Sequence, residues 1–243
     1  IFTNSTQAYA SLGVCAQTDR LWEKLTVRDH VRIFSMLRGV YSQSSIDHVI
    51  REFQLDDVSD QETLTLSGGQ KRKLSVALAF IGAPSVVLLD EPSSGMDVAT
   101  RRLLWNKILA IKEERAIILT SHSMEEVDAL CNRIGIMVNG KLQCLGSSQG
   151  LKSKYGSGYR LSVASSLPVQ TRQWVSDTFG NAILTNQVAH MQHYDIPKSD
   201  TVSLGYLFEQ LETVKEELNI SDYSISEATL EDIFISFAKK QAD

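Results

Sequence analysis

The chain has 243 residues, 43% of them hydrophobic, and a formal net charge of -5 at pH 7. This length suits one large domain or a medium domain joined to a small one, and this apolar content supports a buried core. The acidic balance argues against a broad basic surface, so nucleic acid is not expected as a partner.

The three cysteines, Cys15, Cys131 and Cys144, are far apart and flanked by apolar or small residues. This usage is typical of reduced thiols in a core and favours a cytosolic compartment. No stretch approaches the roughly 20 consecutive apolar residues of a membrane-spanning helix. Because the first residues show neither a starting Met nor a signal peptide, the chain is expected to be a globular piece of a longer protein.

The first third of the chain is expected to be mainly helical. Residues 26–29 have the pattern of a capping box, and apolar residues at helical spacing follow, so a helix is predicted toward Arg38, ended by Gly39. A second amphipathic stretch at 46–53 predicts another helix, and a polar loop leads from it to Leu66. These elements predict a helical subdomain at about residues 24–84.

The pattern changes at Ser85. Residues 86–89 are a short apolar run that ends in Asp90 and Glu91, as expected of a central parallel strand. A helix near 103–109 and a second apolar run at 116–119 follow. Alternating strands and helices predict an α/β fold with a parallel sheet, in which ligands bind at the carboxyl ends of the strands.

Asn139-Gly140, between two apolar runs, predicts a two-residue hairpin because both turn positions need positive φ. This hairpin is expected to close the first domain. After a glycine hinge at 156–158, the order strand, helix, two strands, helix and strand predicts a small ferredoxin-like α+β domain. The expected domains are residues 1–156 and residues 157–243, the second with a C-terminal helix.

The run Leu66-Ser67-Gly68-Gly69-Gln70 precedes a helical pattern and suits anion binding. Paired glycines let backbone N–H groups approach an anion, the helix N-terminus adds a positive dipole, and the Ser67 hydroxyl is a further donor. The alternative is an ordinary serine N-cap after a glycine loop.

Two carboxylates follow the strand at 86–89. Asp90 is placed to hold Mg²⁺, usually through water, and Glu91 to orient or deprotonate an attacking water molecule. The alternative is a buried strand that ends in two solvated acids. That alternative leaves unexplained why the next apolar strand also ends in a polar pair, Ser121-His122, whose histidine is expected to contact a terminal phosphate.

Together these motifs resemble the nucleotide-binding domain of ABC transporters, a P-loop-type ATPase. Residues 66–70 look like the signature motif, residues 86–91 like the Walker B strand and residues 93–97 like the D-loop, with Gln17 in the Q-loop and His122 as the switch histidine. Because independent weak matches multiply, their occurrence in the family's order makes the resemblance specific.

The resemblance implies ATP and Mg²⁺ as cofactors. Two such cassettes pair head to tail, so that each ATP lies between the phosphate loop of one and the signature residues of the other, while residues 26–53 face the transmembrane domains. The implied catalytic residues are Glu91 and His122. Gln17 and Asp90 are the implied metal ligands. The implied nucleotide-binding residues are Gln17, Ser67, Gly68, Gly69, Gln70, Asp90 and Asp97.

Softer features resemble the A subfamily, whose members mostly export or flip lipids. They are the runs at 25–30, 69–75, 94–97, 146–147, 223–224 and 229–231. The final small domain then corresponds to that subfamily's cytosolic regulatory domain, which contacts its counterpart. This implies a location at the cytosolic face of a membrane, with the lipid substrate handled by membrane segments outside this chain.

The chain departs from the family pattern in two places. It contains no Gly-x-x-x-x-Gly-Lys-[Ser/Thr] phosphate loop, and since Gln17 lies almost at its start, the expected missing piece is the N-terminal strand, loop and helix. Val98 stands where the D-loop usually has proline, which puts the rigidity of that turn in doubt. The longest basic run, residues 71–73, is expected to meet solvent or anionic phosphate.

Three functions are compatible with these residues. The leading one is the ATPase engine of a membrane lipid exporter. The second is a truncated or degenerate cassette that acts only in dimerisation or regulation, lending residues 67–70 to another chain's phosphate site. The third is a soluble ABC ATPase of translation or chromosome maintenance, which would lack the membrane-facing helices and the terminal domain.

Overall fold

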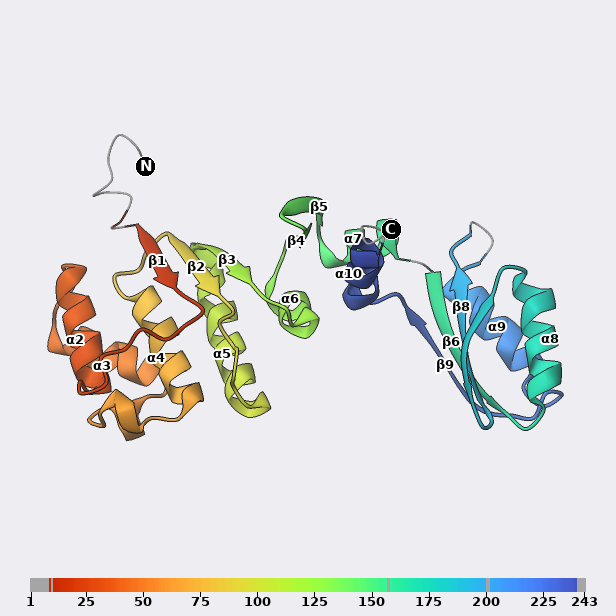
Figure 1. Cartoon of the computed structure of the whole chain (residues 1–243), viewed down its shortest axis with the longest axis horizontal. Coiled ribbons are helices and arrows are strands. Elements are labelled where there is room, and N and C mark those ends of the chain that lie inside the picture. The colour runs from red at the N-terminus through yellow and green to blue at the C-terminus, as the bar shows by residue number, and fades with distance from the viewer. Residues whose placement is uncertain (1–8, 10, 157, 200–201, 240–243) are drawn as a thin grey trace. The chain divides into compact units, whose positions relative to one another are not determined.

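The computed structural model describes residues 9, 11–156, 158–199 and 202–239 (Figure 1). The chain forms two compact units, residues 1–130 and residues 131–243. The second unit begins before the hairpin because the hairpin strand β4 and the helix α7 both pack against the C-terminal helix α10. The domain boundary expected at residues 156 and 157 stays a prediction, and Ser157 lies outside the described residues.

The first unit is built on a three-stranded parallel sheet with the order β1-β2-β3. Its strands are β1 (Leu12–Cys15), β2 (Val86–Asp90) and β3 (Ala116–Thr120). Its helices are α2 (Val27–Leu37), α3 (Gln43–Glu52), α4 (Gly68–Phe80), α5 (Val98–Ile111) and α6 (Met124–Leu130), with short 3₁₀ turns η1 (Asp56–Val58), η2 (Thr63–Thr65) and η3 (Lys112–Glu114). The predicted parallel strands and helices are confirmed, whereas β1 and α6 were not predicted.

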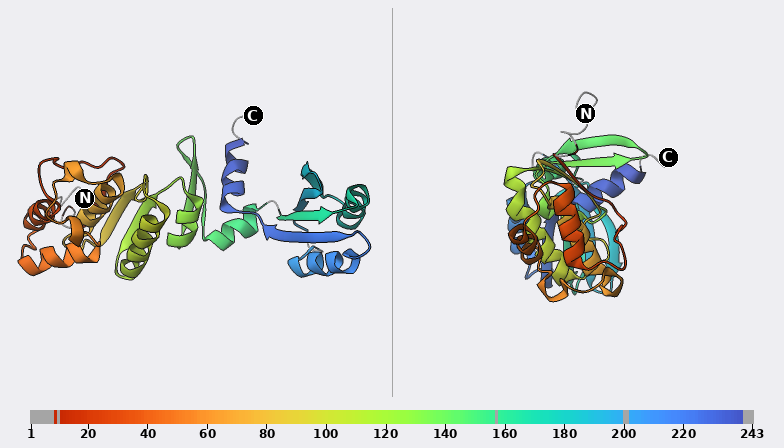
Figure 2. Two further views of the ribbon diagram at one scale, coloured as in Figure 1. Left: turned by 90° about the horizontal axis from the view of Figure 1, so that it is seen from below. Right: turned by 90° about the vertical axis from the view of Figure 1, so that its left-hand side faces the viewer.

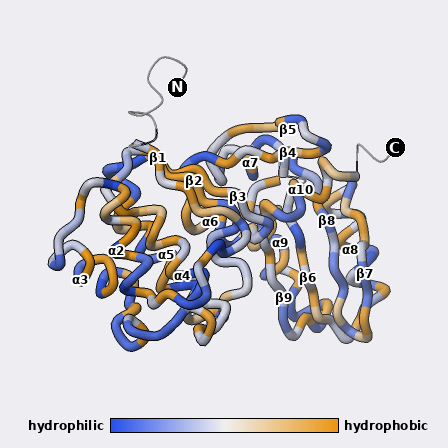
Figure 3. Tube along the Cα trace, turned by 60° about the vertical axis from the view of Figure 1, so that its left-hand side comes forward, coloured by the Kyte–Doolittle hydropathy of each residue, from blue (hydrophilic) through white to orange (hydrophobic). Residues whose placement is uncertain are grey.

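Within the first unit, one face of the sheet is packed and the other is open. On the packed face, Val87 and Leu89 are 0% and 1% exposed, and α4 lies against β1 and β2. On the opposite face, Val14 and Ile118 are 55% and 61% exposed. The strands are hydrophobic over most of their length (Figure 3). Parallel sheets are normally covered on both faces, and the exposed side chains on this face are apolar, as in a buried surface.

Helix α4 approaches β1 most closely at Gly13. A Cβ atom built on Gly13 would lie 2.0 Å from the backbone oxygen of Ala79 and 3.0 Å from Cγ of Pro84. Real Cβ atoms do not approach backbone atoms this closely, so the packing of α4 on the sheet requires glycine at this position.

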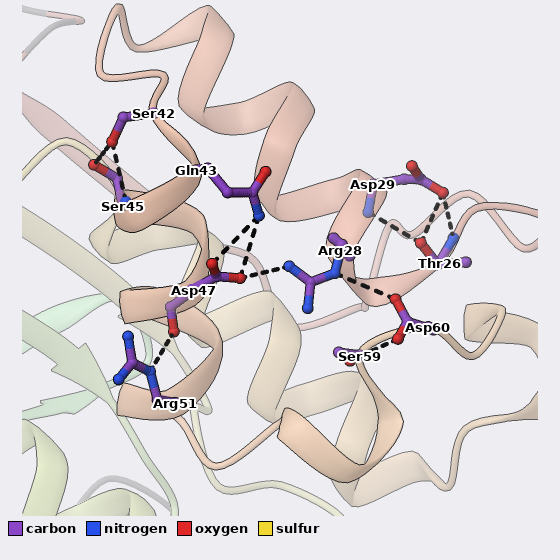
Figure 4. Close-up of polar contacts among 10 residues, drawn as sticks. All are labelled: Thr26, Arg28, Asp29, Ser42, Gln43, Ser45, Asp47, Arg51, Ser59 and Asp60. Carbon is purple, nitrogen blue, oxygen red and sulfur yellow. Dashed lines mark hydrogen bonds and ion pairs between the residues drawn. The ribbon is translucent and has the colours of Figure 1, made fainter.

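Helix α2 begins at the predicted capping box (Figure 4). The Thr26 hydroxyl accepts a hydrogen bond from the Asp29 backbone N–H at 3.1 Å, and the Asp29 carboxylate accepts one from the Thr26 N–H at 3.2 Å. The hydrogen bond that the Thr26 hydroxyl donates to this carboxylate holds the pKa of Asp29 below its ordinary value. Gly39, with φ +70°, follows the end of the helix as predicted.

An ion-pair network joins the two helices that follow β1 (Figure 4). Arg28 of α2 donates to Asp47 of α3 at 2.6 Å and to Asp60, after η1, at 3.2 Å. Gln43 donates to the same Asp47 carboxylate. These groups are partly exposed, so the network contributes little stability, but it fixes the orientation of α2 on α3.

The second unit contains the predicted hairpin and the predicted small α+β fold. Its strands are β4 (Ile134–Val138), β5 (Lys141–Gly146), β6 (Gly158–Ser165), β7 (Ile183–Val188), β8 (Met191–Pro197) and β9 (Ile220–Glu227), and its helices are α7 (Ser148–Tyr155), α8 (Pro168–Phe179), α9 (Leu204–Val214) and α10 (Leu230–Lys239). Asn139 and Gly140 adopt φ of 49° and 73°, which confirms the turn.

Strands β6 to β9 form an antiparallel sheet with the order β7-β8-β6-β9. Helices α8 and α9 pack on it (Figure 2), and the core they close contains Leu161, Tyr194, Val175 and Leu211. The βαββαβ order with two helices on a four-stranded antiparallel sheet is the expected ferredoxin-like fold.

Across the described ranges of both units, no helix combines the length and the apolar character that crossing a membrane would require.

Candidate functional site

The carboxyl ends of the three parallel strands bring four predicted site residues to one edge of the sheet. Gln17 lies two residues after β1, Asp90 is the last residue of β2 with Glu91 directly after it, and His122 lies two residues after β3. Because the strands are adjacent and parallel, their ends meet at this edge. The sequence predicted this for Asp90, Glu91 and His122, whereas Gln17 joins them through β1, which was not predicted.

Glu91 and His122 contact each other. His122 Nδ1 lies 2.8 Å from Glu91 Oε2, and the Glu91 side chain is 16% exposed whereas His122 is 81% exposed. The Glu91 backbone N–H donates to the Thr120 carbonyl at 3.1 Å, which ties the end of β2 to the end of β3. An acid and a histidine held together at a sheet edge can orient water and transfer a proton.

The backbone of Glu91 is in the left-handed region, with φ of 50°. This conformation is unfavourable for a residue with a Cβ atom, so the surrounding structure must hold it in place. Five other non-glycine residues in the described ranges adopt it too, among them Ala83 and Asn219, so it adds strain at Glu91 without marking the site by itself.

Asp90 is suited to a hard cation. Its carboxylate accepts a hydrogen bond from the Thr120 hydroxyl and is otherwise exposed at the sheet edge. The side-chain amide oxygen of exposed Gln17, after the neighbouring strand, is of the same ligand type. Mg²⁺ takes oxygen ligands and is usually held by one or two protein groups together with substrate phosphates and water. The residues present therefore fit Mg²⁺.

The signature residues form the first turn of α4. Ser67 is the N-cap: its hydroxyl accepts from the Gln70 N–H at 3.3 Å, while Gln70 Oε1 accepts from the Ser67 N–H at 2.9 Å. Ser67 is therefore a helix N-cap, as the alternative interpretation held. A serine hydroxyl that accepts one hydrogen bond still carries its own proton, which it can donate to an anion.

The fold itself does not require the two signature glycines. Neither Gly68 nor Gly69 has positive φ. A Cβ on Gly68 would meet nothing within 4 Å, and one on Gly69 would lie 3.9 Å from Thr100 Cγ2. Packing and backbone conformation would both tolerate a side chain at these two positions. Without side chains, the glycines leave room for an external ligand to reach the backbone N–H groups of this turn.

We therefore expect Gly68→Ala to leave the isolated chain as stable as the wild type or more stable by up to about 1 kcal/mol, because alanine favours a helix. The thermal unfolding of both proteins, followed by circular dichroism, tests this. A clear loss of stability would mean that glycine at 68 serves the fold instead of an external ligand.

Asp97 caps the helix that follows the D-loop. Its carboxylate accepts from the backbone N–H groups of Ala99 and Thr100, both at 3.0 Å, and from the Thr100 hydroxyl at 2.6 Å. The Thr100 hydroxyl is the main cause that lowers the pKa of Asp97. Val98 is the first helical residue, where proline is well accommodated, so the departure from the family pattern is compatible with the same turn.

The expectation that the whole basic run faces solvent or phosphate was wrong for Arg72. Its side chain is 3% exposed and donates to groups on both loops at the sheet edge. Helix α4 is buried on nearly all sides from Leu74 onward, and Arg72, two residues earlier, also points into the protein, where its charge needs acceptors. The sequence alone does not distinguish Arg72 from Lys71 and Lys73.

Comparisons with known proteins show what the chain is similar to. Residues 2–94 match the family model described as ABC transporter, and residues 156–227 match the model described as ABCA1-like, C-terminal R1 regulatory domain. A solved structure of the ATP binding subunit of an ABC transporter shares the fold, with a TM-score of 0.54 at 24% identity over 60% of this chain and 62% of that chain.

The chain is also similar to long curated proteins. It is 43% identical to human ATP-binding cassette sub-family A member 2, over 98% of this chain and 10% of that protein. It is 41% identical to the bovine retinal-specific phospholipid-transporting ATPase ABCA4, over 99% and 11%, and 40% identical to the rat phospholipid-transporting ATPase ABCA3, over 95% and 14%. The chain thus spans roughly a tenth of these relatives' length. It belongs to the nucleotide-binding domains of ABC transporters, in the A subfamily.

Proposed function

We propose that this chain is the ATP-hydrolysing cassette of a membrane transporter that moves phospholipids or related amphiphiles. The observation that carries the proposal is the group at the sheet edge, where Glu91 lies 2.8 Å from His122 and beside Asp90. Hydrolysis of a terminal phosphate needs a group that orients water, a contact to the phosphate and a cation ligand, and these three side chains supply one each.

In this proposal Glu91 accepts a proton from the attacking water molecule, and its contact with His122 keeps the carboxylate aimed at the phosphate. His122, which is largely exposed, donates to a terminal phosphate oxygen. Asp90 and Gln17 would hold Mg²⁺, which would neutralise charge on the phosphate oxygens. Ser67, Gly68, Gly69 and Gln70 bind the nucleotide of a second cassette paired head to tail, and Asp97 lies in the D-loop beside that interface.

Lipid transport is supported by two relatives that are named phospholipid-transporting ATPases, and by the match of residues 156–227 to an R1 regulatory domain. That match also favours a transporter over a soluble ABC ATPase of translation or chromosome maintenance. In the proposal the small domain is regulatory, the helices α2 and α3 face the transmembrane domains, and the cassette lies at the cytosolic face of a membrane.

A second candidate is a non-catalytic cassette that lends residues 67–70 to another chain's nucleotide. The observation in its favour is that residues 67–70 form an N-terminal helical turn whose glycines the fold does not require, so this turn is open to a ligand held by another chain.

The test is ATP turnover with Mg²⁺ by the full-length gene product that contains this cassette, reconstituted in phosphatidylcholine vesicles with and without phosphatidylserine. We expect turnover, stimulation by phospholipid, and ATP-dependent movement of a fluorescent phospholipid between leaflets. Turnover without lipid movement would contradict the transport proposal. ATP binding without any turnover would support the non-catalytic cassette.

A further inference from the structure

The cation inside α4 is the least expected polar feature of the first unit. Arg72 lies in the helix that begins at the signature motif, five residues after Ser67, which is about 7.5 Å along the helix axis. Its side chain is 3% exposed. A charged group buried this far is costly unless every donor finds an acceptor.

The guanidinium is bound to the loop that follows β1. Nη1 donates to the backbone oxygen of Ala16 at 2.6 Å and to that of Gln17 at 3.3 Å. The same nitrogen lies 3.1 Å from the carboxylate of Asp19, which compensates the charge. Three acceptors of the Q-loop are therefore held by one nitrogen.

The rest of the guanidinium is bound to the end of β2. Nε donates to the Pro92 carbonyl at 3.2 Å, and Nη2 donates to the Glu91 carbonyl at 3.0 Å and to the Asp90 carbonyl. All its nitrogens are thus in use, and five of the six acceptors are backbone oxygens. The carbonyl groups of Ala16, Gln17, Glu91 and Pro92 lie beyond the strand ends, where the sheet offers them no ladder partner, so Arg72 supplies their donor and joins the two loops.

We propose that Arg72 is a positioning residue that fixes the Q-loop and the Walker B carboxylates relative to each other and ties both to α4. The proposal rests on the proposed ATPase function. In this proposal Arg72 links two nucleotide sites. The N-terminus of α4 binds the nucleotide of the partner cassette, while Gln17 and Glu91 act on the cassette's own nucleotide. A helix moves as a rigid rod, so a shift of α4 when Ser67 engages phosphate moves the Gln17 and Glu91 backbones through Arg72.

A lysine cannot replace this arginine. The ammonium group has three donors around one atom, whereas the planar guanidinium spreads five donors over three nitrogens and reaches both loops at once. Arg72→Lys keeps the charge and loses the bridge. Lys71→Met is the matched control, because Lys71 is the adjacent cation on the same helix and its ammonium contacts Leu64 O and neither loop.

The first test is amide hydrogen exchange, followed by mass spectrometry, on the isolated chain. In Arg72→Lys we expect residues 16–19 and residues 90–93 to exchange about tenfold faster or more, while residues 158–165 in the second unit keep the wild-type rate. In Lys71→Met neither loop changes. Unchanged exchange in either loop of Arg72→Lys would overturn the proposal.

Asp19→Asn provides a second, milder variant if Arg72→Lys does not fold. It removes one acceptor charge and leaves the bonds to β2, so we expect faster exchange at residues 16–19 alone. Equal acceleration of both loops, or of neither, would contradict the division of bonds described above.

The second test is ATP turnover by the full-length gene product. In Arg72→Lys we expect kcat to fall about a hundredfold with little change in the KM for ATP, because the reacting groups are misplaced and the nucleotide still binds. Unchanged kcat would overturn the proposal. If the wild type itself shows no turnover, the proposed function fails, and the hydrogen-exchange result still decides whether Arg72 joins the two loops.

Discussion

Glu91→Gln is expected to lower the kcat for ATP hydrolysis of the full-length gene product by about 10² to 10⁴-fold, the range that a general base contributes. The amide has the shape of the carboxylate and still accepts a hydrogen bond, but it does not take a proton from water. The affinity for ATP with Mg²⁺ should stay near the wild-type value, because Glu91 is not among the proposed nucleotide ligands. Single-turnover hydrolysis and equilibrium binding of a fluorescent ATP analogue measure the two quantities.

The matched control is Glu113→Gln, which removes an exposed carboxylate from the 3₁₀ turn η3, away from the sheet edge. It should hydrolyse ATP at the wild-type rate. Turnover by Glu91→Gln that equals the control would mean that another group activates the water, and it would remove the main support for the catalytic assignment.

The second large effect is on stability. Gly13→Ala is expected to destabilise the chain by about 3 kcal/mol or more, because the new methyl group would overlap the Ala79 carbonyl and force α4 away from β1. This is a large fraction of the roughly 5 to 15 kcal/mol by which domains are stable. Urea unfolding monitored by circular dichroism gives the free energy of unfolding.

Gly69→Ala is the control for this prediction, since its added Cβ would lie 3.9 Å from the nearest side-chain atom, an ordinary contact. The two variants make the same chemical change at two glycines of the same unit. Equal stability of Gly13→Ala and Gly69→Ala would show that α4 does not pack on β1 as described.

The sequence predicted those parts of the fold that local patterns encode. The capping box of α2, the strands that end in Asp90 and before His122, and the Asn139-Gly140 turn each depend on a few neighbouring residues, and all formed as expected. The ferredoxin-like order followed from the alternation of elements.

Features that depend on tertiary packing were not predictable in the same way. Strand β1 is a four-residue run, too short for periodicity to separate it from a loop. Arg72 belongs to a charged triplet, and which of three neighbouring cations turns inward is decided by the direction of α4 against the sheet. The contact between Glu91 and His122 joins residues on different strands, so their positions at the strand ends predicted proximity but not the bond itself.

The left-handed backbone at Glu91 sets the conformational cost of keeping a carboxylate at this edge of the sheet. At φ of 50° glycine is favoured over any residue with a Cβ atom, by a margin on the order of 1 kcal/mol. A glycine at this position would relax the backbone but would lack the carboxylate. The fold therefore holds Glu91 at the sheet edge at a cost in stability, as it does for other residues with a Cβ atom, such as Ala83 and Asn219.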